Sequence, residues 1–138
     1  MTKEFWLNLP VKDIKRTKDF FTKMDFKFNP NYGNSDTSAC LMMGSKNVIV
    51  MFFEEPFFKS CTSNDIADTR QVTEVLLSID AESPQEVDEI AKKATAAGGT
   101  IFSEPRDNQG WMYGCGFSDP DGHRWNVLHM DMSKMPKG

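Results

Sequence analysis

The chain has 138 residues, of which 39% are hydrophobic and 26% are charged, so it is long enough to bury a core as one domain without a disulfide or a structural metal. Its formal net charge of −4 argues against a nucleic-acid partner, because proteins that bind the phosphate backbone usually carry a basic face. The longest apolar run, residues 48–53, is far shorter than the roughly 20 residues of a transmembrane helix, so no membrane partner is expected.

The first part of the chain is predicted to form a strand, a helix and three strands. Hydrophobic residues alternate over residues 4–11, which predicts a strand that Pro10 either ends or places at a sheet edge. Asp13 is then expected to cap a helix that runs to about Met24 with one buried side. There follow a short strand at residues 26–28, a loop rich in turn-forming residues, and a hairpin of two strands at residues 39–43 and 47–54. The predicted order is therefore β-α-β-β-β.

The second part repeats this order after a connector at residues 55–71, where one short helical turn is expected at 56–60. A strand is predicted at residues 72–80. Ser83 as cap and Pro84 at the first helical position predict a helix, which Gly98 is expected to end. Three more strands are predicted at residues 100–103, 111–118 and 124–130, and residues 133–138 are expected to be a mobile tail. Two copies of one unit can bury their half-sized sheets against one another.

The clearest local signal is the Asp-Pro-Asp-Gly turn at residues 119–122, between two runs that read as strands. Pro120 fixes φ at the first corner, and Gly122 tolerates positive φ. Beyond the turn, a strand places alternate side chains on opposite faces: Arg124, Asn126, Leu128 and Met130 on one, and Trp125, Val127 and His129 on the other. The face that looks into a pocket decides which chemistry this strand can support.

The cysteines and lysines are interpreted as structural or solvent-exposed. Cys40, Cys61 and Cys115 are widely spaced, and without a secretory leader they are expected to be reduced thiols in the cytoplasm. Cys115 lies close to the turn and is either a reactive thiol or, as free cysteines mostly are, a small buried hydrophobe. The basic residues of the first helix are interpreted as a solvated face.

Three segments resemble one known superfamily: NLPVKDIKRTKDFFTKMDF at residues 8–26, VIVMFFEEPFF at 48–58 and GFSDPDGHRWNVLHMD at 116–131. They are similar to the glyoxalase, bleomycin-resistance and extradiol dioxygenase proteins, also called vicinal oxygen chelate proteins. Within this group the chain most resembles small bacterial "glyoxalase-related" proteins of undefined activity.

The resemblance implies an α+β fold in which two tandem β-α-β-β-β repeats form a curved, cup-like mixed sheet with helices outside. It implies one domain over residues 1–138, with repeats at about 1–54 and 72–132, and it implies a homodimer. Metal-using members place one ligand, usually His, Gln or Glu, on each of four strands that line the cup.

In this sequence the four ligand positions implied by the resemblance fall on Trp6, Met51, Glu74 and Asn126. Tryptophan cannot bind a metal, a thioether is a poor ligand for hard or borderline ions, and an asparagine carbonyl is a weak neutral ligand. Only Glu74 could ligate well, whereas a catalytic metal needs at least three strong protein ligands. Neither a metal nor another cofactor is therefore expected.

The residues expected to line the cup are Trp6, Asn8, Met51, Phe53, Glu74, Arg124 and Asn126. They would make a mostly apolar cavity with an aromatic floor and a few polar groups, which is how small organic ligands are usually held. Two structural alternatives stay open: Glu74 and Arg124 neutralise each other, and Trp6 is a core residue that closes the cup.

Three functions remain possible at this point. The chain is a metal-free protein that binds a small apolar or aromatic molecule, as the bleomycin-resistance members do. Alternatively, it is an enzyme, either a metal-dependent lyase, isomerase or dioxygenase or one that uses Glu74 as a general base. The third possibility is an interaction module whose cup is filled by its own side chains, and the fold alone does not choose among the three.

Overall fold

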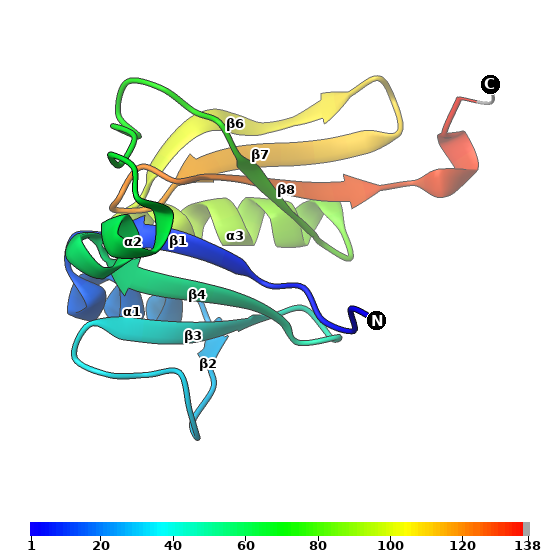
Figure 1. Cartoon of the computed structure of the whole chain (residues 1–138). Coiled ribbons are helices and arrows are strands. Elements are labelled where there is room, and N and C mark those ends of the chain that lie inside the picture. The colour runs from blue at the N-terminus through cyan, green and yellow to red at the C-terminus, as the bar shows by residue number, and fades with distance from the viewer. Residues whose placement is uncertain (137–138) are drawn as a thin grey trace. The chain divides into compact units, whose positions relative to one another are not determined.

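The computed structural model describes residues 1–136, which fall into two compact units, residues 1–68 and 69–136. The boundary between the units lies in the stretch predicted as a connector. Each unit contains one four-stranded mixed sheet and one long helix that packs on a face of that sheet (Figure 1).

The first unit follows the predicted order of elements. Its elements are β1 (Leu7–Val11), α1 (Ile14–Lys23), β2 (Lys27–Phe28), β3 (Ser38–Met43), β4 (Val48–Glu54) and α2 (Glu55–Thr62). The strand order in the sheet is β1-β4-β3-β2. Strand β1 pairs with β4 in parallel and the other pairs are antiparallel, so the first and last strands of the repeat lie side by side.

Helix α1 begins as predicted, because the Asp13 side chain accepts hydrogen bonds from the backbone N–H groups of Lys15 and Arg16. Its buried side carries Phe21, whose ring stacks on that of Phe52 in β4 with 5.2 Å between centroids. Phe52 therefore points toward α1. Because side chains alternate along a strand, Met51 and Phe53 lie on the other face of this sheet.

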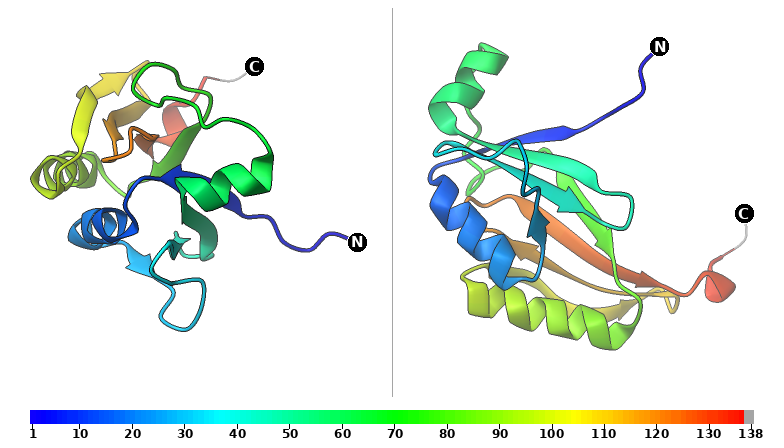
Figure 2. Two further views of the ribbon diagram at one scale, coloured as in Figure 1. Left: turned by 60° about the vertical axis from the view of Figure 1, so that its left-hand side comes forward. Right: turned by 90° about the horizontal axis from the view of Figure 1, so that it is seen from below.

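The second unit repeats the arrangement with β5 (Leu76–Asp80), α3 (Pro84–Ala97), β6 (Thr100–Asn108), β7 (Met112–Ser118) and β8 (Arg124–Met130), followed by a 3₁₀ turn at Met132–Lys134. The strand order is β5-β8-β7-β6, with β5 parallel to β8. Helix α3 runs along one face of this sheet (Figure 2). The predicted α+β class and the two β-α-β-β-β repeats are thus confirmed.

Helix α3 has the predicted boundaries. The Ser83 hydroxyl accepts the backbone N–H of Glu86 at 3.1 Å, Pro84 occupies the first turn, and Gly98 ends the helix with φ of 106°. The buried side chains of α3 pack toward the sheet face that carries Trp125 and Phe117, whose rings are parallel with 6.2 Å between centroids. Arg124 and Asn126 therefore lie on the face away from α3.

Four elements differ from the prediction by more than one residue. The strand expected at residues 72–80 begins only at Leu76, because its parallel partner β8 begins at Arg124, directly after the turn, and residues 72–75 have no strand beside them. For a similar reason β1 begins at Leu7, since its pairing with β4 starts there. Pairing with the neighbouring strand sets both of these starts.

The other two differences are extensions. Strand β6 continues to Asn108 past Pro105, which an edge strand with register shifts between Ile101 and Arg106 tolerates. The short turn expected at residues 56–60 is a helix over Glu55–Thr62. The predicted tail begins inside the 3₁₀ turn, and residues 137–138 lie outside the described residues.

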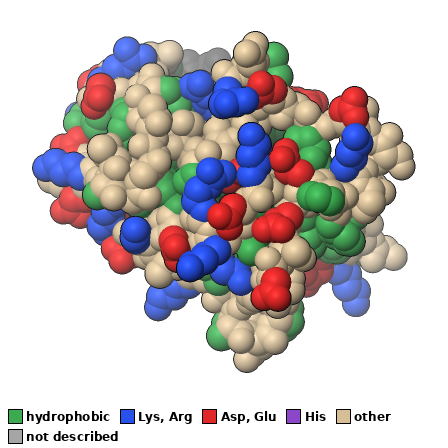
Figure 3. Space-filling view, turned by 90° about the vertical axis from the view of Figure 1, so that its left-hand side faces the viewer, with side chains coloured by type: hydrophobic (Ala, Val, Ile, Leu, Met, Phe, Trp, Pro, Cys, Tyr) green, Lys and Arg blue, Asp and Glu red, His purple; other side chains and the backbone are tan. Residues whose placement is uncertain are grey.

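On the face of the protein shown in Figure 3, lysine and arginine side chains are interspersed with aspartate and glutamate side chains. Such mixing of signs is typical of a solvated surface. Within residues 1–136, no helix has the length and hydropathy that a membrane crossing requires.

Candidate functional site

The first unit contains a hollow with a volume of about 460 Å³, called here the N-terminal hollow. It is lined by residues 3–6 ahead of β1, by Tyr32 in the loop before β3, and by side chains of the β3–β4 hairpin that include Cys40 and Met51. Cys40 and Met51 are register partners, so they share the sheet face opposite α1. Aromatic and sulfur-containing side chains therefore border this space together with the charged residues Lys3, Glu4 and Lys46.

The N-terminal hollow brings together two of the four residues predicted from this unit, Trp6 and Met51. Trp6 remains 53% exposed, which rules out a role as a core residue that closes the site. Asn8 is the register partner of Met51 on β1 and lies on the same sheet face. Phe53 lies one alternation further along β4, where its ring contacts Phe57 of α2 at 4.8 Å between centroids.

The second unit brings Arg124 and Asn126 onto one face of β8. The Asn126 amide nitrogen donates to the Ser78 hydroxyl at 3.4 Å across the β5–β8 pair. Glu74 does not join them in the sheet, because it precedes β5 in an exposed segment. No ion pair connects Glu74 with Arg124, so the alternative in which these two charges neutralise each other is wrong.

Arg124 instead stacks on an aromatic ring that the sequence analysis did not consider. Its guanidinium carbon lies 4.4 Å from the centroid of the Phe102 ring. Phe102 belongs to β6, and it lay within the strand predicted at residues 100–103. Gly114 and Gly116 alternate along β7, so neither places a side chain on the sheet face that carries Arg124. This pattern was the sequence signal that side chains from neighbouring strands cover β7 there.

The turn that directs β8 contains a buried carboxylate, Asp119. It accepts hydrogen bonds from the backbone N–H groups of Asp121 and His123 at 3.0 and 3.1 Å, and from the Trp125 indole N–H at 3.1 Å. Burial raises the pKa of Asp119 to about 6, against the charge of His123 and the Trp125 hydrogen bond, which lower it. These contacts fix the turn and the Trp125 side of β8, which is a structural role.

Cys115 is a buried hydrophobe and does not act as a reactive thiol. Its sulfur lies 3.9 Å from the Val87 carbonyl oxygen of α3. Burial, with smaller contributions from Asp88 and Glu104, raises the pKa of the Cys115 thiol to about 11. Because the thiolate is the nucleophile, this thiol is unreactive near neutral pH.

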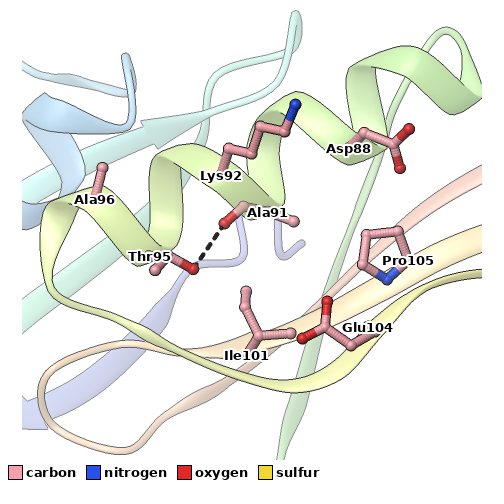
Figure 4. Close-up of a pocket in the computed structure, with 8 residues that line it drawn as sticks. All are labelled: Asp88, Ala91, Lys92, Thr95, Ala96, Ile101, Glu104 and Pro105. Atoms are coloured by element: carbon pink, nitrogen blue, oxygen red, sulfur yellow. Dashed lines mark hydrogen bonds between the residues drawn. The ribbon is translucent and has the colours of Figure 1, made fainter.

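A second hollow, of about 470 Å³, lies between α3 and β6 on the helix-covered side of the second sheet (Figure 4). Glu104 and Pro105 of β6 face it, whereas Lys92 of α3 points away from Glu104. The Asp88 carboxylate already accepts the Tyr113 hydroxyl at 2.7 Å. None of the predicted site residues lies here.

The residues at the four implied ligand positions do not fit a divalent metal. In the first unit, Trp6 offers only an indole N–H and Met51 only a thioether. In the second unit, Glu74 lies in an exposed segment, and the Asn126 amide is bonded to Ser78. Across residues 1–136, no three His, Cys, Asp or Glu side chains gather closely enough to hold a metal ion.

The histidines do not change this result. His123 is buried in the turn, and the Nδ1 atom of His129 lies 3.1 Å from the Ala81 carbonyl oxygen on the face opposite Asn126.

The sequence matches one family model, and the fold is similar to that of solved structures. Residues 5–127 match the family model described as the glyoxalase/bleomycin resistance protein/dioxygenase superfamily. A hypothetical protein from S. aureus has a similar structure, with a TM-score of 0.82, 29% sequence identity and coverage of 94% of each chain. No curated protein matches the sequence significantly.

Two more distant structures share the fold. A glyoxalase/bleomycin resistance protein/dioxygenase family enzyme from Burkholderia phytofirmans has a TM-score of 0.74 at 17% identity, over 91% of this chain and 96% of that one. The fosfomycin resistance protein FosX from Listeria monocytogenes, in a complex with Mn(II) and sulfate, has a TM-score of 0.68 at 18% identity, over 97% and 94%.

Proposed function

The chain belongs to the glyoxalase/bleomycin resistance protein/dioxygenase superfamily, and from this membership we propose that it binds a small apolar or aromatic molecule, without a metal ion, in the N-terminal hollow. The observation that carries the proposal is the lining of that hollow. Phe5, Trp6 and Tyr32 border a space of about 460 Å³, a volume typical of small-molecule sites. Trp6 and Met51 stand at positions where a metal-using relative would place ligands.

The aromatic and sulfur-containing part of the lining, which stands beside Lys3, Glu4 and Lys46, favours a flat ligand. Indole and phenol rings present π faces for stacking, and the Met51 and Cys40 sulfur atoms add polarizable contacts. Binding needs no reaction at these residues, because none of them is placed as a nucleophile or a base. Burial raises the pKa of the Cys40 thiol, which keeps it protonated near neutral pH.

The proposal is tested by thermal unfolding with neutral aromatic probes such as indole and 2-naphthol. A ligand that binds only the native state stabilises it by about 2.7 kcal/mol at a concentration 100 times its Kd, so the midpoint of unfolding should rise with probe concentration. We expect Trp6→Ala to weaken probe binding at least tenfold, because it removes the largest ring in the hollow.

Phe57→Ala is the matched control, since Phe57 is 51% exposed, close to the exposure of Trp6, and lies outside the hollow. It should leave probe binding unchanged. If no neutral aromatic probe raises the midpoint, or if Trp6→Ala binds probes as well as the wild type, the proposal is wrong.

A further inference from the structure

The Arg124 side chain of the second unit has a buried donor without a partner among the described residues. Its Nε atom is buried and has no hydrogen-bond partner within residues 1–136. Among the same residues the side chain makes no ion pair, and its one recorded interaction is the stacking on Phe102. A buried donor without an acceptor is costly, and charged groups cost most, so this donor calls for an acceptor, which a bound ligand could supply.

The stacking on Phe102 depends on a glycine in the intervening strand. A Cβ atom at Gly116 of β7 would lie 2.4 Å from the Phe102 ring, so any other residue there would displace the ring. The absence of a side chain at Gly116 lets the ring extend from the edge strand β6 across β7 and reach Arg124. The pair is therefore positioned by three neighbouring strands.

The Phe102 ring covers one face of the guanidinium. Arginine is planar and carries its N–H donors in that plane, so a ring against one face does not compete with an acceptor at the edge. A carboxylate is also planar and can accept two such bonds in parallel. The arrangement fixes the guanidinium plane before any ligand arrives, which reduces the entropy cost of binding.

The neighbours of Arg124 on this sheet face suit the rest of an organic acid. Leu76 is its register partner on β5 and is 54% exposed. The Asn126–Ser78 pair lies one alternation further along the same two strands and supplies amide and hydroxyl groups. An apolar body could cover Leu76 and Phe102 while polar substituents meet Asn126 and Ser78.

We propose that Arg124 binds the carboxylate of a small organic acid, held edge-on by a guanidinium that Phe102 fixes in place. The inference goes beyond the proposed function, because it concerns residues of the second unit and not the N-terminal hollow. It assigns the binding of a carboxylate to a separate group of residues within the second unit. The group consists of Arg124, Phe102, Asn126, Ser78 and Leu76.

The test compares benzoate with benzamide, which has nearly the same shape but no charge. Isothermal titration at low salt should give wild-type protein at least tenfold tighter binding of benzoate, and added salt should reduce this preference. Arg124→Gln should abolish it. Arg124→Lys keeps the charge but not the planar fork, so it should retain only part of the preference for benzoate. If Arg124→Gln does not fold, Arg124→Lys takes its place in the test.

A control variant and an NMR signal test whether Arg124 itself binds the carboxylate. Lys92→Gln removes an exposed cation on α3 and should not change benzoate binding. In proton–nitrogen NMR spectra, the arginine Nε–H signal that disappears in Arg124→Gln should shift on titration with benzoate and stay in place with benzamide.

Equal binding of benzoate and benzamide, a preference that survives in Arg124→Gln, or an Nε–H signal unmoved by benzoate would overturn this inference. Such results are separable from a failure of the proposed function. If Trp6-dependent binding of neutral aromatics persists while benzoate gains nothing, only the inference about Arg124 fails. If neutral probes do not bind at all, the proposed function fails, whatever benzoate does.

Discussion

The Asp119 carboxylate concentrates three hydrogen bonds in the turn between β7 and β8, two from backbone N–H groups and one from Trp125. Without that carboxylate the turn would leave these donors unpaired inside the protein. The neighbouring charges are His123 and Asp121: His123 lowers the pKa of Asp119 and Asp121 raises it. Burial is the largest effect, and it favours the protonated form.

The raised pKa of Asp119 makes stability depend on pH. Its folded-state pKa of about 6 exceeds the unfolded value of 3.8, so the folded state binds more protons in this interval. The stabilisation is fully present below about pH 4 and is lost as pH rises through about 6. Chemical denaturation at pH 4, 5, 6 and 7 should show this loss in the wild type and a flatter profile in Asp119→Asn. Identical pH profiles for the two proteins would refute it.

At the level of the element, helix α3 begins with the clearest cap in the chain. The Ser83 hydroxyl satisfies the backbone N–H of Glu86, one of the donors that a helix start leaves unpaired. Ser83→Ala should destabilise the second unit by about 1 kcal/mol and speed hydrogen exchange at Glu86. Ser60→Ala is the control, because that exposed hydroxyl bonds only the Phe57 carbonyl within its own helix. Equal stability losses in the two variants would contradict the capping role.

For the whole molecule, the donor set at Trp6, Met51, Glu74 and Asn126 leads to a prediction about metal content. Protein purified without chelators or metal-affinity steps should contain far less than one Zn, Ni, Fe or Mn per chain. Glu74→Ala should give the same elemental analysis. Near-stoichiometric metal that disappears in the variant would instead support the alternative of a metal-dependent enzyme. The homodimer implied by the resemblance also stays a prediction.

The sequence predicted elements well where the signal was local. The cap at Ser83, the stop at Gly98 and the turn before Arg124 each depend on a few adjacent residues, and all three occur as predicted. The alternation along β8 also placed Arg124 and Asn126 on one face.

The failures in the strands share one physical cause, which is dependence on a neighbouring strand. The starts of β1 and β5 are set by where β4 and β8 can pair with them, which no local pattern reports. The stacking of Phe102 on Arg124 joins β6 to β8 across a glycine, so alternation alone could not find it. Of the seven predicted lining residues, Glu74 was placed in a strand that begins two residues later.

The pairing of first with last strands also constrains how the chain folds as it is synthesised. Strand β1 finds its partner only once β4 has been made, and β5 must wait in the same way for β8. The antiparallel hairpins β3–β4 and β7–β8 bring nearby segments together and can form early, whereas each parallel pair must close a long loop. The first unit can therefore complete its sheet before β8 exists, and a chain interrupted before Arg124 would leave β5 as an unpaired, aggregation-prone edge.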